Sequence, residues 1–286
     1  HRAWSCLGAV LGNHEKIIRG CSAGGNGPYL GMMILGIDIG GTGVKGGLVQ
    51  LPHGVLKGDP VHVPTPHPAS PAALTRAVKK LVVHFQWKGV VGAGFPGPIR
   101  AGIVETAVNL SPQWVGKNPA KIFQKATGQR FVVINDADAA GLAEVHHGAG
   151  KKEKGVIVMI TLGTGIGSAL FHRGELIPNT ELGHLTIRGK DAEKLASAKA
   201  REENDWSWKK WSRKVREYLH QVDRLINPDL IIVGGGVSKR AEKWLPRASQ
   251  GVRAQVVPAK LHNEAGIVGA AMAAGKTGRG DSSYPA

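Results

Sequence analysis

Cysteine is nearly absent from this chain of 286 residues. The two that occur, Cys6 and Cys21, both precede the first stretch with a clear secondary-structure pattern. The part of the chain that we expect to fold therefore has no thiol, and disulfides cannot stabilise it. This composition fits a reducing compartment, and we expect a cytoplasmic protein.

Long apolar runs and acidic residues are also scarce. No stretch approaches the roughly 20 apolar residues that a membrane-spanning helix needs. The 37 lysines and arginines outnumber the 21 aspartates and glutamates and give a net charge of +16. Such an excess indicates a polyanionic partner, for which nucleic acid, an anionic membrane and a phosphate polymer are the candidates. Basic residues crowd into residues 188–216, where a solvated helix face is an equally good interpretation.

Glycine is abundant instead, and glycine turns organise the sequence. In residues 34–49, apolar residues alternate with small or polar ones on both sides of such a turn, which predicts a β-hairpin. Glycine amides in a tight turn can face an anion. The predicted phosphate-binding residues are Asp38, Gly40, Gly41, Thr42, Gly43 and Lys45, and the Asp38 carboxylate could hold hydrated magnesium. The alternative is a hairpin whose glycines serve the turn alone.

A second hairpin pattern occupies residues 155–172. A strand over residues 155–160 leads into the glycine turn of residues 161–168, and a return strand follows over residues 169–172. We therefore expect an internal duplication in which two phosphate-binding turns face each other across a cleft. The second turn contributes Thr164, Gly165 and Gly167.

A third glycine turn follows a buried-type strand over residues 230–233. It consists of Gly234, Gly235 and Gly236 and opens a predicted helix. Because a helix N-terminus favours anions, a nucleotide or a polyanion could bind there.

The remaining patterns are those of an α/β protein. Helices are predicted over residues 71–85, 191–201, 206–226 and 264–274, the first of them capped by Ser70. The long helix carries an apolar stripe that we assign to the core, formed by Trp208, Trp211, Val215, Leu219, Val222 and Leu225. Residues 92–97 match the dinucleotide pattern G-x-G-x-x-G, but Pro96 and Pro98 exclude the helix start that such a site needs. We predict a rigid, cleft-lining loop there instead.

Polar residues at strand ends are the candidate catalytic groups. Asn135 and Asp136 follow a buried-type strand and precede a helix, so they are either helix caps or catalytic groups at the end of a strand. We interpret Asp138, in the first helical turn, as compensating the helix dipole only. Glu181 and His184 form a candidate hydrogen-bonding pair for hydroxyl groups, although a solitary histidine is more often structural.

Taken together, these stretches resemble the ROK family of sugar kinases, and within it the polyphosphate-using branch. The resemblance runs from about residue 34 to residue 274. Residues 38–45 are similar to the family's first phosphate motif, residues 134–144 to its catalytic segment, residues 162–167 to its second phosphate motif and residues 181–184 to its sugar-binding segment.

The resemblance implies an α/β, two-domain sugar kinase/actin-like (ribonuclease H-like) fold with the active site in the interdomain cleft. We expect a smaller domain over residues 32–147, completed by a helix over residues 264–275, and a larger domain over residues 148–263. Residues 1–31 are expected to be a disordered or non-native leader, and residues 276–286 a loose tail.

The resemblance also implies phosphorylation of glucose, and of mannose as a further acceptor, at the 6-hydroxyl, with inorganic polyphosphate and ATP as donors. Asp136 is then the general base, and Mg²⁺ binds near Asp38. The implied sugar-binding residues are Asn109, Asn135, Asp136, Glu181, His184 and Glu193. Many relatives carry a cysteine-rich zinc site after the Gly-His pair, but no cysteine follows Cys21 here, so we expect no zinc.

The basic excess favours polyphosphate as the donor, because a phosphate chain needs a track of cations. Lys151 and Lys152 beside the second hairpin, residues 199–216, and the third turn with Gly234, Gly235 and Gly236 are predicted to form this donor site. A basic face that serves only solubility is the alternative.

Two other functions stay open: a strictly ATP-dependent glucokinase or other hexose kinase, and a sugar-sensing regulator. Residues 1–31 are too short and unpatterned for the helix-turn-helix of the family's repressors, so we expect no nucleic-acid partner. No membrane partner is expected either. A homodimer is the family's habit and the commonest symmetry.

Overall fold

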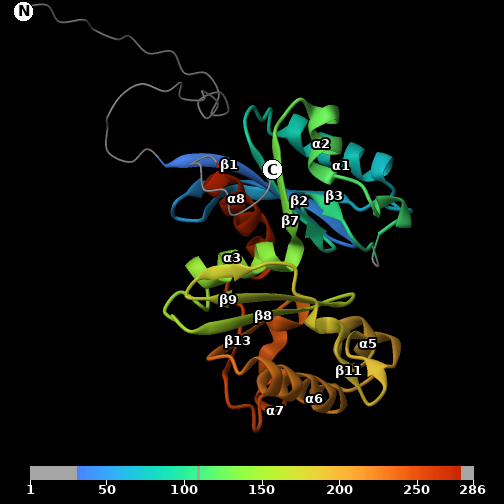
Figure 1. The fold of residues 1–286 in the computed structure, drawn as a ribbon, viewed down its shortest axis with the longest axis vertical. Helices are drawn as coiled ribbons and strands as arrows, with labels where there is room; N and C mark the ends of the chain where they lie inside the picture. Colours follow the sequence, from blue (N-terminus) through green and yellow to red (C-terminus); the bar gives the residue numbers. More distant parts are fainter. Residues whose placement is uncertain (1–30, 108–109, 278–286) are drawn as a thin grey trace, which may run out of the picture. The chain divides into compact units, whose positions relative to one another are not determined.

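The computed structural model describes residues 31–107 and 110–277, which belong to one compact unit (Figure 1). The predicted leader before Gly31, the predicted sugar-binding residue Asn109 and the tail beyond Thr277 lie outside the described residues. Two five-stranded sheets form the framework, with the strand orders β3-β2-β1-β4-β7 and β10-β9-β8-β13-β14.

The two sheets are built in the same way. In each, a three-stranded antiparallel meander is extended on one side by two parallel strands. The strands of the first sheet are β1 (Met32–Ile39), β2 (Gly43–Leu51), β3 (Val55–Pro64), β4 (Val91–Phe95) and β7 (Phe131–Asn135). Those of the second are β8 (Val156–Leu162), β9 (Ile166–His172), β10 (Glu175–Ile177), β13 (Leu230–Gly234) and β14 (Gln255–Pro258). The shared order and directions confirm the predicted internal duplication.

Helices and short strands connect these sheets. The α-helices are α1 (Pro71–His84), α2 (Pro119–Thr127), α3 (Asp136–His147), α4 (Glu193–Ala196), α5 (Ala198–Glu203), α6 (Trp208–Ile226), α7 (Leu245–Ala248) and α8 (Ala265–Thr277). The short strands β5 (Ile99–Arg100) and β6 (Ile103–Val104) pair with each other, as do β11 (Thr186–Ile187) and β12 (Lys190–Asp191). The 3-10 segments are η1 (Pro112–Trp114), η2 (Leu182–His184), η3 (Gly236–Lys243) and η4 (His262–Glu264).

Helices α3 and α8 form the centre of the molecule. Every residue of α3 from Ala137 to Val145 is buried, because the helix packs against α8 and against strands of both sheets (Figure 1). One apolar core therefore contains residues of β1, α3, β8, β9, β13 and α8. Contact between the two helices is close, since a Cβ atom at Gly269 would overlap the main-chain carbonyl of Ala139. The predicted final helix, α8, thus packs on the first sheet. The predicted domain boundaries remain a prediction.

Two helix predictions need correction. The sequence predicts one helix over residues 191–201, but the chain forms β12, α4 and α5, because Ser197 is extended and caps α5 through the N–H of Ala200. The middle of the stripe on α6 is buried as predicted, but Trp208 at its start is only partly buried and Leu225 at its end is 60% exposed. Asp223 takes the inward position there, since its carboxylate bonds Arg253 and the N–H of Ala254.

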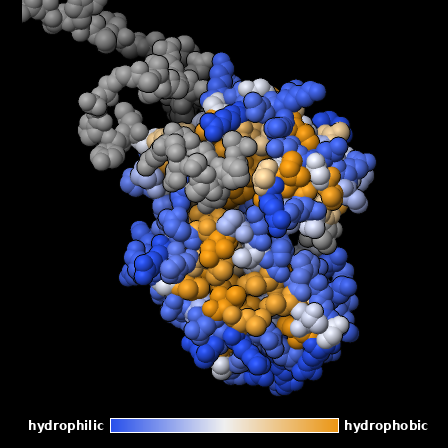
Figure 2. All heavy atoms as spheres, in the orientation of Figure 1, coloured by the Kyte–Doolittle hydropathy of each residue, from blue (hydrophilic) through white to orange (hydrophobic). Residues whose placement is uncertain are grey.

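The surface is mainly hydrophilic. On the face shown in Figure 2, hydrophilic side chains cover most of the periphery, while apolar side chains gather over the second sheet. Among the described residues, none of the helices has the combined length and hydrophobicity needed to cross a bilayer.

Candidate active site

A cavity of about 200 Å³ brings together half of the predicted site residues. Its volume is below the roughly 300–1,000 Å³ typical of pockets for drug-sized ligands, so it suits a small metabolite. The predicted residues that line it are Gly41, Asn135, Asp136, Thr164, Gly165, Gly167, Glu181, His184, Glu193 and Gly235. The loop at Pro96, Gly97 and Pro98 lines it too, as predicted.

Asp136 stands at the junction of β7 and α3. Asn135 caps the helix, accepting hydrogen bonds from the N–H groups of Ala137 at 2.8 Å and Asp138 at 3.1 Å. Burial, with repulsion from the Asp38 carboxylate, raises the pKa of Asp136 to about 7, although the N–H of Ala137 opposes this. A carboxylate with a pKa near neutrality is well suited to accept a proton from a hydroxyl group.

The first glycine turn follows the prediction in part. Asp38 pairs directly with Lys45 across β1 and β2, with 3.9 Å between Oδ2 and Nζ. The pKa of Asp38 is raised, because burial outweighs the opposing charge of Lys45. The Gly40 amide is not available to an anion as predicted, because its N–H closes the turn by donating to the carbonyl of Gly43 at 2.9 Å. Gly41, at the tip, lines the cavity.

The two glycine turns face each other. A Cβ atom at Gly41 would lie 3.7 Å from Oγ1 of Thr164, which is on the second turn. The second turn is closed by a hydrogen bond of 3.0 Å from the N–H of Gly163 to the carbonyl of Gly165. Gly167 allows β9 to approach α3, since a Cβ there would lie 2.9 Å from the Cβ of Ala137. The second turn is thereby held beside Asp136.

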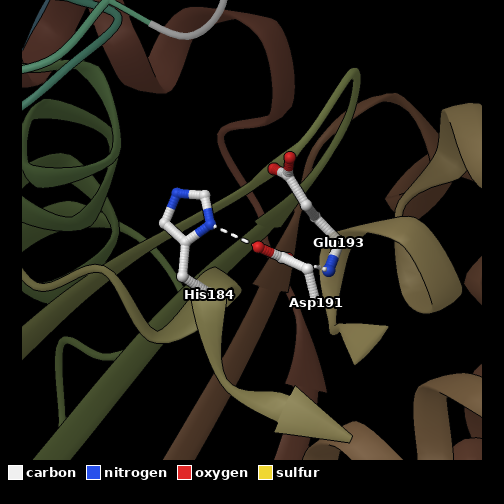
Figure 3. A group of neighbouring side chains, drawn as sticks. All are labelled: His184, Asp191 and Glu193. Carbon is white, nitrogen blue, oxygen red and sulfur yellow. Dashed lines mark hydrogen bonds and ion pairs between the residues drawn. The ribbon is translucent and has the colours of Figure 1, made fainter. Parts of the chain in front are cut away.

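Glu181, His184 and Glu193 line the same cavity. His184 Nε2 lies 3.8 Å from a carboxylate oxygen of Glu181, and His184 Nδ1 lies 2.8 Å from Oδ2 of Asp191 (Figure 3). The hydrogen bond to Asp191 raises the pKa of His184, and burial raises that of Glu181. We did not predict Asp191 from the sequence. The available signal was the pair Arg188 and Gly189, which turns β11 back into β12 and returns the chain to His184.

A second, more open cavity of about 680 Å³ adjoins the first, because Gly163 and Thr164 line both. Thr42 and Gly236 also line it. Its cationic side chains are Lys199, Arg201, Lys239 and Arg240. The first two belong to the predicted basic cluster, whereas Lys239 and Arg240 come from η3, which the sequence did not single out.

Other donor-site predictions are corrected. Lys151 and Lys152 precede β8, and the glycine turn follows its far end, so seven residues of strand separate them, roughly 20 Å. Neither lysine lines either cavity. Gly234 is the buried last residue of β13. Gly236 opens a 3-10 segment with a non-helical residue at Arg240, which is a poorer anion site than the predicted helix N-terminus.

Asp138 does more than compensate the helix dipole. Its side chain is buried, and Oδ2 accepts a hydrogen bond of 2.9 Å from the N–H of Asn179. The amide of Asn179 in turn exchanges two hydrogen bonds of 2.9 Å with the main chain of Ile99. Asp138 thus positions Asn179, whose hydrogen bonds join the loop after β4 to the loop that leads to Glu181. Burial raises its pKa to about 7.

Comparison with solved structures defines the class. The inorganic polyphosphate/ATP-glucomannokinase from Arthrobacter sp. strain KM is 47% identical, with a TM-score of 0.83 over 86% of this chain and 99% of that one. A ROK family glucokinase from Streptomyces griseus, solved with glucose and AMPPNP, is 25% identical, with a TM-score of 0.74 over 86% and 100% of the two chains. The fold is the actin-like two-domain fold of sugar kinases, as predicted.

Sequence comparison gives the family. The model of the ROK family matches residues 34–197. The polyphosphate glucokinase of Mycobacterium tuberculosis strain H37Rv is 48% identical over 239 residues, which cover 83% of this chain and 89% of that protein. The chain belongs to the ROK family.

Proposed function

We propose that this chain phosphorylates glucose at the 6-hydroxyl, with inorganic polyphosphate as the donor and ATP as a second donor. Asp136 carries the proposal, since its neutral-range pKa and its place in a small polar cavity suit a base for a sugar hydroxyl. The adjoining cation-lined cavity suits a chain of phosphates. The similarity to polyphosphate glucokinases and to a polyphosphate/ATP-glucomannokinase supports the same substrates, with mannose as a further acceptor.

In the proposed reaction, the 6-hydroxyl oxygen attacks the terminal phosphorus of the donor. As the new O–P bond forms, the Asp136 carboxylate accepts the hydroxyl proton, and the phosphoanhydride O–P bond breaks. The leaving group is a polyphosphate chain one unit shorter, or ADP. The glycine turns at Gly41 and Thr164 face each other beside Asp136 and would align the transferred group, which is most of what phosphoryl transfer asks of a protein.

The proposed acceptor contacts come from Asn135, Glu181, His184 and Glu193, which share the cavity with Asp136. Carboxylate and imidazole groups can pair with neighbouring hydroxyls of a hexose in fixed directions. Asn109 stays a predicted sugar contact outside the described residues.

A divalent metal fits the same site. Asp38 offers hard oxygen ligands, and its charge is close enough to Asp136 to raise that residue's pKa, so a cation there would relieve the repulsion. We propose Mg²⁺, held by Asp38 directly or through water. When bound, it would neutralise charge on the donor phosphates. A cytoplasmic location and a homodimer also remain predictions.

The test is glucose 6-phosphate formation by the pure protein with magnesium, with polyphosphate and ATP supplied separately at matched phosphate concentration. We expect product with both donors and more with polyphosphate. Product with ATP alone would favour an ordinary ATP-dependent glucokinase, and no product with either would favour another sugar or a sensing role.

Asp136→Asn tests the assigned base. The amide cannot accept the proton, so kcat should fall by about 10² to 10⁴-fold, while glucose binding measured by calorimetry is retained. Asp59→Asn, which changes an exposed aspartate in β3, is the matched control and should keep both. Near-normal turnover of the Asp136 variant would show that another group accepts the proton.

A further inference from the structure

The hairpin of β11 and β12 returns the chain to the acceptor side of the cavity. Its two turn residues, Arg188 and Gly189, both have positive φ values, 52° and 73°, as expected of a tight two-residue hairpin. Thr186 pairs with Asp191, and the hairpin is closed below by a hydrogen bond of 2.9 Å from the N–H of Ala192 to the carbonyl of Leu185. Asp191 is therefore fixed beside His184, seven positions earlier in the chain.

The two carboxylate oxygens of Asp191 have different partners. Oδ2 lies 2.8 Å from Nδ1 of His184, and Oδ1 accepts a hydrogen bond of 3.1 Å from the main-chain N–H of Glu193 at the start of α4 (Figure 3). His184 and Glu193 line the cavity proposed for the acceptor, whereas Asp191 does not line it and borders a separate hollow. One carboxylate outside the cavity lining thus holds two of the residues that line it.

We propose that Asp191 is a positioning residue for the sugar acceptor, which orients the His184 imidazole and anchors the turn that carries Glu193. The inference rests on the proposed function, because it assumes that these residues bind a hexose. A carboxylate that accepts a hydrogen bond from Nδ1 fixes the proton on that nitrogen and fixes the plane of the ring. In the neutral ring, Nε2 can then only accept a hydrogen bond, and it does so in a fixed direction. Nε2 is the nitrogen on the side of Glu181, 3.8 Å from its carboxylate.

A bound cation is the competing explanation for this arrangement. Ligand atoms of His184, Asp191 and Glu193 lie within 4.8 Å of one another. However, the contact between Nδ1 and Oδ2 is already a short hydrogen bond, and the second Asp191 oxygen is used by the main chain. The direct carboxylate–imidazole bond accounts for the geometry without an ion, and the experiment separates the two explanations.

The experiment compares Asp191→Ala and Asp191→Asn with wild type and with the exposed control Asp59→Asn. Loss of a charge-assisted hydrogen bond that orients a binding group should raise KM for glucose roughly ten- to hundredfold in Asp191→Ala. We expect kcat and the KM for the donor to stay within about threefold, because ground-state and transition-state binding of the sugar are lost together. Asp191→Asn keeps an acceptor oxygen and should restore much of the affinity.

A second readout does not depend on activity. The ring ¹⁵N shifts of His184, measured at a pH high enough for a neutral imidazole, should show the proton on Nδ1 in wild type and a mixture of tautomers in Asp191→Ala. If wild type shows the predicted ring shifts but binds no hexose, the result would count against the proposed function and leave the orienting bond established.

Two results would overturn the inference. One is a folded Asp191→Ala protein with the wild-type KM for glucose and unchanged ring shifts. The other concerns glucose binding measured by calorimetry without donor. If wild type loses affinity on chelation and regains it with added Zn²⁺, while the variant does neither, the cluster binds a cation. Insensitivity of wild-type binding to chelation is the expected result.

Discussion

Asp138 offers a quantitative test of how the catalytic segment is built. In Asp138→Asn, the amide oxygen can still accept the hydrogen bond from the N–H of Asn179, but the side chain no longer titrates. The other carboxylate oxygen, Oδ1, is buried without a hydrogen-bond partner, so the amide group meets the same surroundings as a protonated carboxyl. The substitution therefore removes chiefly the cost of ionising a buried acid.

The size of that cost follows from the pKa. Burial raises the pKa of Asp138 from 3.8 to about 7 in the folded protein, which corresponds to roughly 4 kcal/mol at pH 8. Because the folded pKa is the higher one, the folded state binds the proton more tightly. The stabilisation from Asp138 is complete below about pH 4 and is lost as the pH rises to about 7. Relative to wild type, the variant should thus gain about 2–3 kcal/mol between pH 5 and pH 8.

Urea unfolding of both proteins at pH 5 and pH 8 measures this change. The difference between the two pH values is the diagnostic quantity, because any cost of the unpaired amide is the same at both. Asp59→Asn should show no such trend, since Asp59 is exposed. A difference between variant and wild type that stays constant within about 0.5 kcal/mol would refute the picture of a buried carboxyl that is largely neutral below pH 7.

Two further predictions concern the helix contact and the donor cavity. Gly269→Ala should lower the free energy of unfolding by about 1–3 kcal/mol in urea titrations, because its Cβ would overlap the Ala139 carbonyl. Alanine usually stabilises a helix relative to glycine, so a stabilised variant would show that α3 and α8 are not in close contact. Lys239→Ala and Arg240→Ala should each raise the KM for polyphosphate and reduce the slope of its logarithm against log salt by up to about 1, with the KM for glucose unchanged. Lys151→Ala is the control and should behave as wild type. An equal effect of Lys151→Ala would place the polyphosphate site near the start of β8.

The parts of the fold that could be predicted from the sequence depend on short-range patterns. Alternating apolar residues around glycines identify β1 with β2 and β8 with β9, because the period of two and the turn chemistry lie within one short stretch of chain. The position of Asp136 at the end of a buried strand is equally local. The mutual approach of the two turns followed from the resemblance between the two halves, and the structure confirms it through Gly41 and Thr164.

The residues that were missed or misplaced depend on geometry that adjacency in sequence does not give. Lys151 and Lys152 are close to the second hairpin in the chain, but they lie at the other end of a seven-residue strand. Lys239 and Arg240 are remote in the chain, yet they line the second cavity because β13 runs parallel to β8 and places η3 at the same edge of the sheet. Asp191 was predicted as the first residue of a helix over residues 191–201, whereas it is the last residue of the β11–β12 hairpin, whose pairing brings it back to His184.

The packing of α8 has a consequence for how the chain is made. Helix α8 supplies apolar side chains to the core beneath β1 and β4, although the first strand is synthesised about 225 residues earlier. At typical translation rates, one face of the first sheet stays without its cover for roughly ten to fifty seconds. Fragments that end before α8 should expose that face and aggregate, so the first half of this duplicated fold cannot complete its core until the last helix has been synthesised.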